Sequence, residues 1–317
     1  MNSQHIVKCF LCLFPLLNFA QPSMHPNKPI HLYVPNNSDN SVSFCNIDNA
    51  SNKLTDCHTI GLAVQGPEAV VLDSSQTHAY ITNNDAYSVS KCDVGTQDTF
   101  KKLNIHTCVR TGTSFSIPAG ITINKDNTKA YVTDYDGGVS VCSIQKNNGH
   151  LDTCQITGSG FRGPADISLN SSNTKAYIAN VDNHTISICQ IDSQTGELYA
   201  CHTTGSGFAS PEGITLNPAN TFAYITNFKN NSISKCAVEL ESGLLTQCTS
   251  TGSGFSGHGH IAFDPSGTKA FVPSFLSNQI FVCLVDIQNG ELFHCADAGG
   301  KGFSKPAKLF LSNWILS

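Results

Sequence analysis

Short apolar runs alternate with clusters of turn residues along nearly the whole chain. In the stretch 211–250, runs rich in β-branched and aromatic residues are separated by Gly, Pro, Asn and Ser, and none of them has a helical period. This pattern predicts four short strands, at 213–217, 223–227, 232–237 and 244–250. The polar positions between them are mostly Ser, Thr and Asn, which suits an all-β protein rich in turns.

The same four-strand pattern recurs at an almost constant interval. Cys142, Cys189, Cys236 and Cys283 mark equivalent positions that are each 47 residues apart, a period typical of propellers and solenoids. The chain begins with a second strand near Leu32 and ends with a first strand at 307–312, so the last strand can complete the first unit. A solenoid would need polar end caps, which we do not find. The sequence therefore predicts an all-β fold, a six-bladed β-propeller of four-stranded blades closed by the C-terminal strand.

Twelve of the fourteen cysteines form six pairs, one in each repeat. Five pairs are separated by 12 positions and the second by 16; the pairs are Cys45/Cys57, Cys92/Cys108, Cys142/Cys154, Cys189/Cys201, Cys236/Cys248 and Cys283/Cys295. Residues directly opposite each other on antiparallel strands are close enough for a disulfide. We therefore predict one disulfide per blade. Pairing residues inward from the two cysteines leaves a three-residue turn, whose last residue should be left-handed and therefore Gly or Asn. All five short copies have Gly or Asn at this position: Asn52, Gly149, Gly196, Gly243 and Gly290.

The first 20 residues indicate an exported protein, and the overall charge argues against one class of partner. Residues 1–20 have a positive start, a short apolar core and a small residue before a polar change, which predicts a signal peptide. Residues 21–29 are expected to be an extension and 30–317 a single propeller. No other apolar run is long enough to span a membrane. The periplasm, the cell surface and secretion all remain open, and we expect a monomer.

With 13% charged residues, a net charge of −5 and no basic cluster, the composition argues against nucleic-acid binding.

Four consecutive repeats carry a recognisable strand motif. These are Ala79-Tyr-Ile-Thr-Asn83, Ala130-Tyr-Val-Thr-Asp134, Ala176-Tyr-Ile-Ala-Asn180 and Ala223-Tyr-Ile-Thr-Asn227. They resemble the YVTN-type β-propeller repeat family, and the resemblance covers essentially the whole chain after the predicted signal peptide. The first and last copies depart from the motif. The resemblance implies an exported propeller scaffold and no single activity, because propellers host many functions.

The loop after the fourth strand has a nearly uniform sequence, Thr157-Gly-Ser-Gly-Phe161, which recurs at 204–208 and 251–255. A glycine-rich loop can cradle a phosphate when its amides converge. Repetition in several blades favours a structural role, a tight turn whose phenylalanine fills the space between blades.

A unique site should lie where the repeats differ, at the start of the innermost strand. Charged and histidine residues occupy these positions and would surround one mouth of the central channel. The candidate ligand-binding residues are Glu68, Asp166, Glu212, His258, His260 and Lys308. Two histidines two positions apart share a strand face and could join carboxylates around a divalent metal. Acids in the loops between the second and third strands, including Asp134 and Asp182, could attract a cation or stabilise turns.

Three functions are compatible with this sequence. We expect a non-enzymatic binding scaffold that holds a protein, a glycan or a small ligand at the mouth, with no cofactor. The alternative is a metal-dependent hydrolase, lactonase-like, with its site at the same mouth; no catalytic residue can be assigned from sequence. A purely structural surface protein is the third hypothesis.

Overall fold

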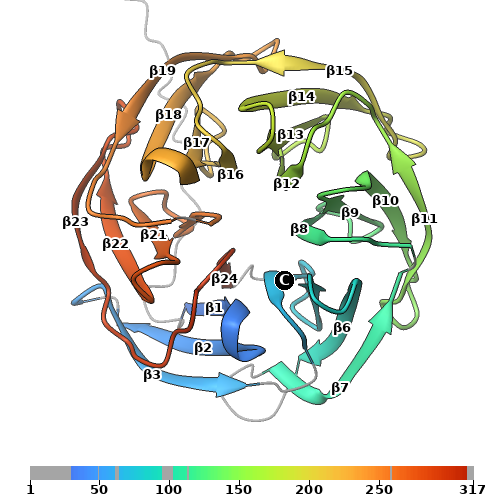
Figure 1. Cartoon of the computed structure of the whole chain (residues 1–317), viewed down its shortest axis with the longest axis horizontal. Helices are drawn as coiled ribbons and strands as arrows, with labels where there is room; N and C mark the ends of the chain where they lie inside the picture. The colour runs from blue at the N-terminus through green and yellow to red at the C-terminus, as the bar shows by residue number, and fades with distance from the viewer. Residues whose placement is uncertain are drawn as a thin grey trace, which may run out of the picture.

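Six antiparallel four-stranded sheets, formed by the described residues, stand like blades around a central axis (Figure 1). The structure is a computed structural model and describes residues 30–48, 50–60, 64–94, 103–112, 114–257 and 259–312. The predicted signal peptide, the extension at 21–29 and the candidate His258 lie outside these residues. The sequence-based prediction of a six-bladed propeller is confirmed. Among the described residues, no helix is long and apolar enough to cross a membrane.

The blades follow the chain in order, with one exception at the closure. The first blade contains β24 (Phe310–Ser312), β1 (His31–Asn36), β2 (Ser41–Asp48) and β3 (Lys53–Ile60). The second contains β4 (Pro67–Leu72), β5 (His78–Asn83), β6 (Ser88–Val94) and β7 (Leu103–Thr111). The third contains β8 (Pro118–Ile123), β9 (Lys129–Asp134), β10 (Gly138–Ile144) and β11 (Leu151–Thr157).

The remaining three blades repeat the arrangement. The fourth contains β12 (Pro164–Leu169), β13 (Lys175–Asn180), β14 (Thr185–Ile191) and β15 (Leu198–Thr204). The fifth contains β16 (Pro211–Leu216), β17 (Phe222–Asn227), β18 (Ser232–Val238) and β19 (Leu245–Thr251). The sixth contains β20 (Ala262–Phe263), β21 (Lys269–Ser274), β22 (Gln279–Val285) and β23 (Leu292–Asp297). Two short 3-10 helices, η1 (Asn37–Asp39) and η2 (Phe228–Asn230), follow β1 and β17.

The ring closes as the sequence predicts, because β24 from the end of the chain pairs with β1 from its start. Leu32 lies opposite Leu311, and Ala307 N donates to Pro35 O at 3.1 Å. The outer strands β3, β7, β11, β15, β19 and β23 form the rim in Figure 1. Each blade thus hydrogen-bonds within itself, and the closure adds main-chain bonds between the two ends of the chain.

The core lies between the blades, where the second strand of each sheet is buried on both faces. In β13 every residue after the first is buried, whereas β15 at the rim is buried only at its two ends. Apolar clusters accordingly combine residues of adjacent blades, as where Tyr177 and Ile188 pack with Phe208 and Ile214. This packing explains why the second strands read as continuous apolar runs and not as alternating ones.

The repeated Thr-Gly-Ser-Gly-Phe loop has the structural role that its repetition indicates. Phe161 packs against the cluster that contains the disulfide of the next blade. A Cβ added to Gly158 would lie 2.9 Å from the Phe161 ring and 3.1 Å from Cys201 Sγ, and its φ of +68° favours glycine. Thr157 Oγ1 accepts a hydrogen bond from Leu198 N at 2.6 Å. The loop therefore joins neighbouring blades.

All six predicted disulfides are present, including the one in the stretched second repeat. Each joins the third and fourth strands of one blade, with a Cα–Cα distance of 4.0 or 4.1 Å. The bonds are Cys45–Cys57, Cys92–Cys108, Cys142–Cys154, Cys189–Cys201, Cys236–Cys248 and Cys283–Cys295. Disulfides form and persist in oxidising compartments, so six of them within one chain indicate an exported environment.

The two cysteines of each bond are not the regular, directly opposed pair that we predicted. In every blade the register of the third and fourth strands shifts at the disulfide, so the bonded cysteines lie at a β-bulge. Their environments also differ. The cysteine on the third strand is fully buried, whereas its partner on the outer strand is partly exposed. These partly exposed cysteines are Cys57, Cys108, Cys154, Cys201, Cys248 and Cys295.

The predicted three-residue turn between the paired cysteines is wrong in length. Gln145 N donates to His150 O and Gly149 N donates to Gln145 O, both at 2.8 Å, so the turn contains the four residues 146–149. The ladder recovers its register through the β-bulge at the disulfide, where Thr153 has a φ of 49°. The left-handed residue is where the sequence placed it, since Gly149 has a φ of 71°.

Candidate functional site

Five of the six candidate residues lie at one mouth of the channel, at the start of an innermost strand or just before it. Glu68, Asp166 and Glu212 are the second or third residues of β4, β12 and β16, while His260 and Lys308 lie shortly before β20 and β24. The closure brings distant segments together here, because Lys308 N donates to Glu68 O at 2.9 Å. The sixth candidate, His258, is not among the described residues.

Lys308 is a buried ammonium paired with a carboxylate. Its Nζ lies 3.0 Å from Glu68 Oε1, and the side chains of Lys308 and Glu68 are only 5% and 20% exposed. Asn37 Nδ2 donates to the second oxygen of Glu68 at 3.2 Å. Burial by itself disfavours the charged form, yet the carboxylates of Glu68, Asp166 and Glu212 outweigh it and raise the pKa of Lys308. Lys308 therefore stays a cation at neutral pH.

His260 and Asp166 form a hydrogen-bonded pair across the channel, from the sixth and fourth blades. Their Nδ1 and Oδ2 atoms are 2.7 Å apart, with 23% and 3% of the side chains exposed. Asp166 Oδ2 also accepts from Ile214 N at 2.9 Å. Gly120 makes room for this carboxylate, because a Cβ there would lie 2.7 Å from Asp166 Oδ1. The aspartate is thus held in place, and it orients the imidazole.

Glu212 is a carboxyl group whose environment opposes its ionisation. Burial raises the pKa of Glu212 to about 7; Lys308 lowers it, and the charge of Glu68 raises it further. Such a group is half protonated near neutral pH, the condition in which a carboxyl can both accept and donate a proton. Strongly shifted carboxyls in a cleft are typical of functional sites.

A small cavity opens in the channel beside these groups. Its volume is about 160 Å³, and Asp166, His260 and Lys308 line it together with residues of β4, β8, β12 and β24. Ligand sites usually exceed about 300 Å³, so the cavity itself fits only a small ring or part of a larger ligand that protrudes from the mouth.

Among the described residues, the donor groups at the mouth are largely paired with one another. Within the described ranges, no group of three or more His, Cys, Asp or Glu side chains could hold one. Two of the groups that a metal could use are engaged, since His260 Nδ1 faces Asp166 and Glu68 faces Lys308. Because His258 is not described, the divalent metal remains a prediction, and we derive no step through it.

Sequence reasoning missed one member of the site and left the role of its outer acids open. Asn37, in η1, had no signal because its contact with Glu68 spans 31 positions. Asp134 accepts from the backbone N atoms of Ser116 and Ile117, and therefore stabilises a turn. Tyr135 Oη donates to Asp182. Both acids are therefore engaged in hydrogen bonds within the loops of this face.

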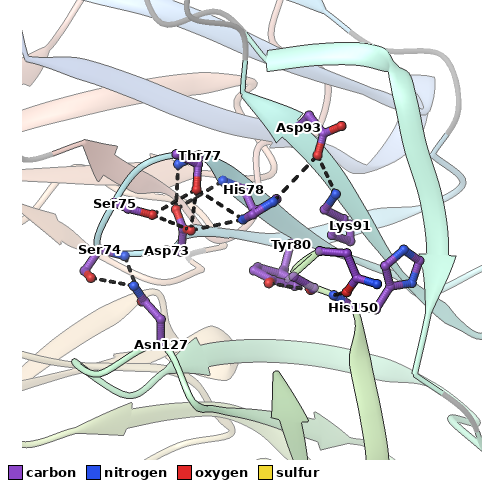
Figure 2. A network of polar contacts seen from close by, with 12 residues as sticks. Asp73, Ser74, Ser75, Thr77, His78, Tyr80, Lys91, Asp93, Asn127 and His150 are labelled. Carbon is purple, nitrogen blue, oxygen red and sulfur yellow. Dashed lines mark hydrogen bonds and ion pairs between the residues drawn. The ribbon is translucent and has the colours of Figure 1, made fainter. Parts of the chain in front are cut away.

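A second cavity, of about 390 Å³, lies away from the mouth, between the second and third blades. Figure 2 shows the polar network beside it. Asp73 accepts from Thr77 N at 2.7 Å and from Ser75 Oγ at 2.7 Å, and His78 Nδ1 lies 3.2 Å from its Oδ2. The cavity is larger than that of the channel, but its central carboxylate is already bound within its own turn.

The same turn occurs in other blades, which argues for a structural origin of this network. Asn124 Oδ1 accepts from Thr128 N at 2.8 Å, as Asp73 does from Thr77. Residues at equivalent positions repeat these bonds at Asn170 and Asn217. We therefore place the candidate functional site at the channel mouth.

Fold and site together define a β-propeller with an ion pair and an Asp–His pair at one channel mouth. The sequence profile described as "Lactonase, 7-bladed beta-propeller" matches residues 25–213. The chain thus belongs to this lactonase β-propeller family, although its described residues form six blades. The narrower resemblance to the YVTN-type repeat stays a prediction. No match was found among curated proteins.

Solved structures of similar fold are distant in sequence. A candidate 6-phosphogluconolactonase from Bacteroides fragilis is 17% identical, with a TM-score of 0.65 and coverage of 92% of this chain and 100% of that one. The periplasmic gluconolactonase PpgL of Pseudomonas aeruginosa is 14% identical, with a TM-score of 0.65 and coverage of 90% and 99%. A chain of a nidogen/laminin complex reaches a TM-score of 0.68 at 9% identity, covering 89% and 98%. At these identities the likeness shows the fold alone.

Proposed function

We propose that the protein is a lactone hydrolase whose site is the channel mouth. The observation that carries this proposal is the hydrogen bond of 2.7 Å between Asp166 and His260 on the wall of a cavity that Lys308 also lines. Membership of the lactonase family supports it, as do two distant structural relatives, one named as a candidate 6-phosphogluconolactonase and the other as a gluconolactonase. They favour the hydrolase over the binding scaffold that we expected from sequence.

The Asp–His pair supplies a general base. Asp166 accepts the Nδ1 proton of His260, which leaves Nε2 as the acceptor for a proton from water. The water oxygen forms a bond to the lactone carbonyl carbon while its proton passes to Nε2. His260 then returns this proton to the ring oxygen as the carbon–oxygen bond of the ring breaks. The product is a hydroxy acid, which releases a proton at neutral pH.

Lys308 provides the positive charge that the reaction needs. The carbonyl oxygen becomes negative when water adds, and an ammonium group already fixed in a poorly solvated site stabilises that charge with little reorganisation. Glu68 and Asn37 hold Lys308 in position. Glu212, with its pKa of about 7, adds a group that can exchange protons at the same mouth.

The disulfides and one structural relative bear on the compartment in which the enzyme would work. The six disulfides fit an exported enzyme, and one structural relative is named as a periplasmic protein. We infer a location outside the cytoplasm, with cleavage of residues 1–20, which N-terminal sequencing of the mature protein would test.

Hydrolysis of δ-gluconolactone, followed in a pH-stat above the spontaneous rate, tests the proposal. General-base catalysis contributes about 100-fold to 10,000-fold, so His260→Ala should lower kcat/KM by at least 100-fold. Asp166→Asn should lower kcat at a nearly unchanged KM. His202→Ala is the matched control, since this histidine is exposed on the outer strand β15.

Three outcomes would redirect the proposal. Full activity in His260→Ala would rule out the base that we assign. Loss of activity in EDTA, restored by a divalent ion, would favour the predicted metal over Lys308. Absence of lactone hydrolysis by the intact protein would return the binding scaffold to first place.

A further inference from the structure

The charges at the mouth are unbalanced. Lys308 Nζ lies 3.0 Å from Glu68, and the carboxylates of Glu68, Asp166 and Glu212 all raise the pKa of this ammonium group. With its carboxylates ionised, the mouth therefore carries more negative than positive charge.

The positive charge of Lys308 is also already engaged. Its Nζ is 3.0 Å from Glu68 Oε1, and the backbone N of Lys308 donates to the carbonyl of Glu68. A ligand phosphate would have to compete with this carboxylate for the same ammonium. Because the pair is buried, solvent screens this competition only weakly.

Neither arginine of the chain is found in an ion pair with the carboxylates of the mouth among the described residues. Arginine forks and convergent backbone amides are the common phosphate sites. The chain has two arginines, and Arg110 Nη2 donates to Tyr87 O at the rim. Arg162 is exposed in the loop before β12. Lys229, in η2, and Lys305 are exposed as well.

We propose that this mouth selects cyclic esters that carry no negative charge and discriminates against phosphorylated or carboxylated lactones. This inference rests on the proposed lactonase function. An anion at the mouth would face Glu68 and Asp166, and it would hold Glu212 in its protonated form. A neutral polyhydroxy lactone meets no such repulsion, and its hydroxyl groups can donate to the same carboxylates.

A substrate pair that differs only in charge tests the selection. We would measure kcat/KM for δ-gluconolactone and for its 6-phosphate at 0.05 M and at 0.5 M NaCl, subtracting spontaneous hydrolysis. We expect the neutral ester to be favoured at least tenfold at low salt. The preference should shrink at high salt, because added ions screen the repulsion during approach.

The results separate the two proposals. Hydrolysis of the phosphorylated ester with an equal or higher kcat/KM would overturn the inference and leave the lactonase function standing. Absence of hydrolysis of either ester above the blank would refute the proposed function and the inference with it.

The variant Glu68→Gln tests the cause of the selection. It frees the charge of Lys308, so the ratio of kcat/KM for the phosphorylated over the neutral ester should rise at least fivefold. Glu241→Gln is the matched control, because Glu241 is exposed in the turn between β18 and β19 and should leave the ratio unchanged. An unchanged ratio in Glu68→Gln would contradict the mechanism. Should this variant not fold, the salt dependence of the kcat/KM ratio in the unaltered protein decides whether charge repulsion causes the selection.

Discussion

Replacing Glu212 with glutamine should stabilise the protein in a pH-dependent way. The carboxyl is largely buried, and no hydrogen bond to it is found among the described residues. Burial and the charge of Glu68 together outweigh the attraction of Lys308, so the pKa of Glu212 rises from 4.5 to about 7. Ionised Glu212 is therefore a cost to the folded state, which glutamine removes at nearly constant size.

The magnitude follows from proton linkage. A pKa difference of one corresponds to about 1.4 kcal/mol, so the change from 4.5 to about 7 sets an upper limit of about 3 kcal/mol. Residual solvent contact reduces this, and we expect about 2 kcal/mol. The folded protein binds this proton more tightly than the unfolded chain does. Between pH 4.5 and about 7, stability therefore falls as the pH rises, and above that window the full cost remains.

Urea unfolding monitored by circular dichroism between pH 4 and pH 8.5, with the disulfides intact, measures the effect. The unaltered protein and Glu212→Gln should have equal free energies of unfolding near pH 4, and the variant should be more stable by about 2 kcal/mol at pH 8. Glu241→Gln, at an exposed site, should show no such pH-dependent difference.

A difference between the unaltered protein and Glu212→Gln that does not vary with pH would refute this reasoning. It would mean that Glu212 ionises as readily in the folded protein as in the unfolded chain. A variant that is less stable at pH 8 would show that the attraction of Lys308 outweighs burial.

Three further predictions concern the contacts between and within blades. Phe208→Ala should lower the free energy of unfolding by about 3–5 kcal/mol, because the ring is buried between the fourth and fifth blades; thermal unfolding measures it, and a loss below 1 kcal/mol would contradict the packing role. Removing the Cys189–Cys201 disulfide with two serines should cost about 3 kcal/mol through the closed loop; an unchanged unfolding temperature would argue against it. Tyr177→Phe removes the bond of 2.8 Å from Tyr177 Oη to Gly243 O and should cost about 1–3 kcal/mol in urea unfolding, whereas a gain in stability would count against the need for this bond.

Most of the fold could be predicted because the information is local and repeated. Alternation of apolar runs and turn residues predicts strands wherever it occurs. Because the pattern occurs in six copies, a strand that is ambiguous in one repeat can be assigned from the equivalent positions of the others. In the fifth blade the predicted strands 213–217 and 232–237 correspond to β16 (Pro211–Leu216) and β18 (Ser232–Val238). The turn length was predicted wrongly for a local reason. The β-bulge places an extra residue in the fourth strand, and the spacing of the two cysteines does not reveal it.

The site could be predicted only as a set of positions. Comparing the repeats identified the residues that differ at the start of each inner strand, and the structure brings five of them to one mouth. Which residue pairs with which could not be predicted. Lys308 meets Glu68 across 240 positions and His260 meets Asp166 across 94.

The sequence by itself determined the repeat, the closure, the six disulfides and the left-handed turn residues such as Gly149, because each depends on spacing or on the conformation of one residue. Only the tertiary structure decided that Lys308 is paired with Glu68, that Asp166 orients His260, and that Glu212 resists ionisation. These properties depend on burial and on distances between side chains from different blades. Such distances are set when the ring closes, and no segment of the chain encodes them alone.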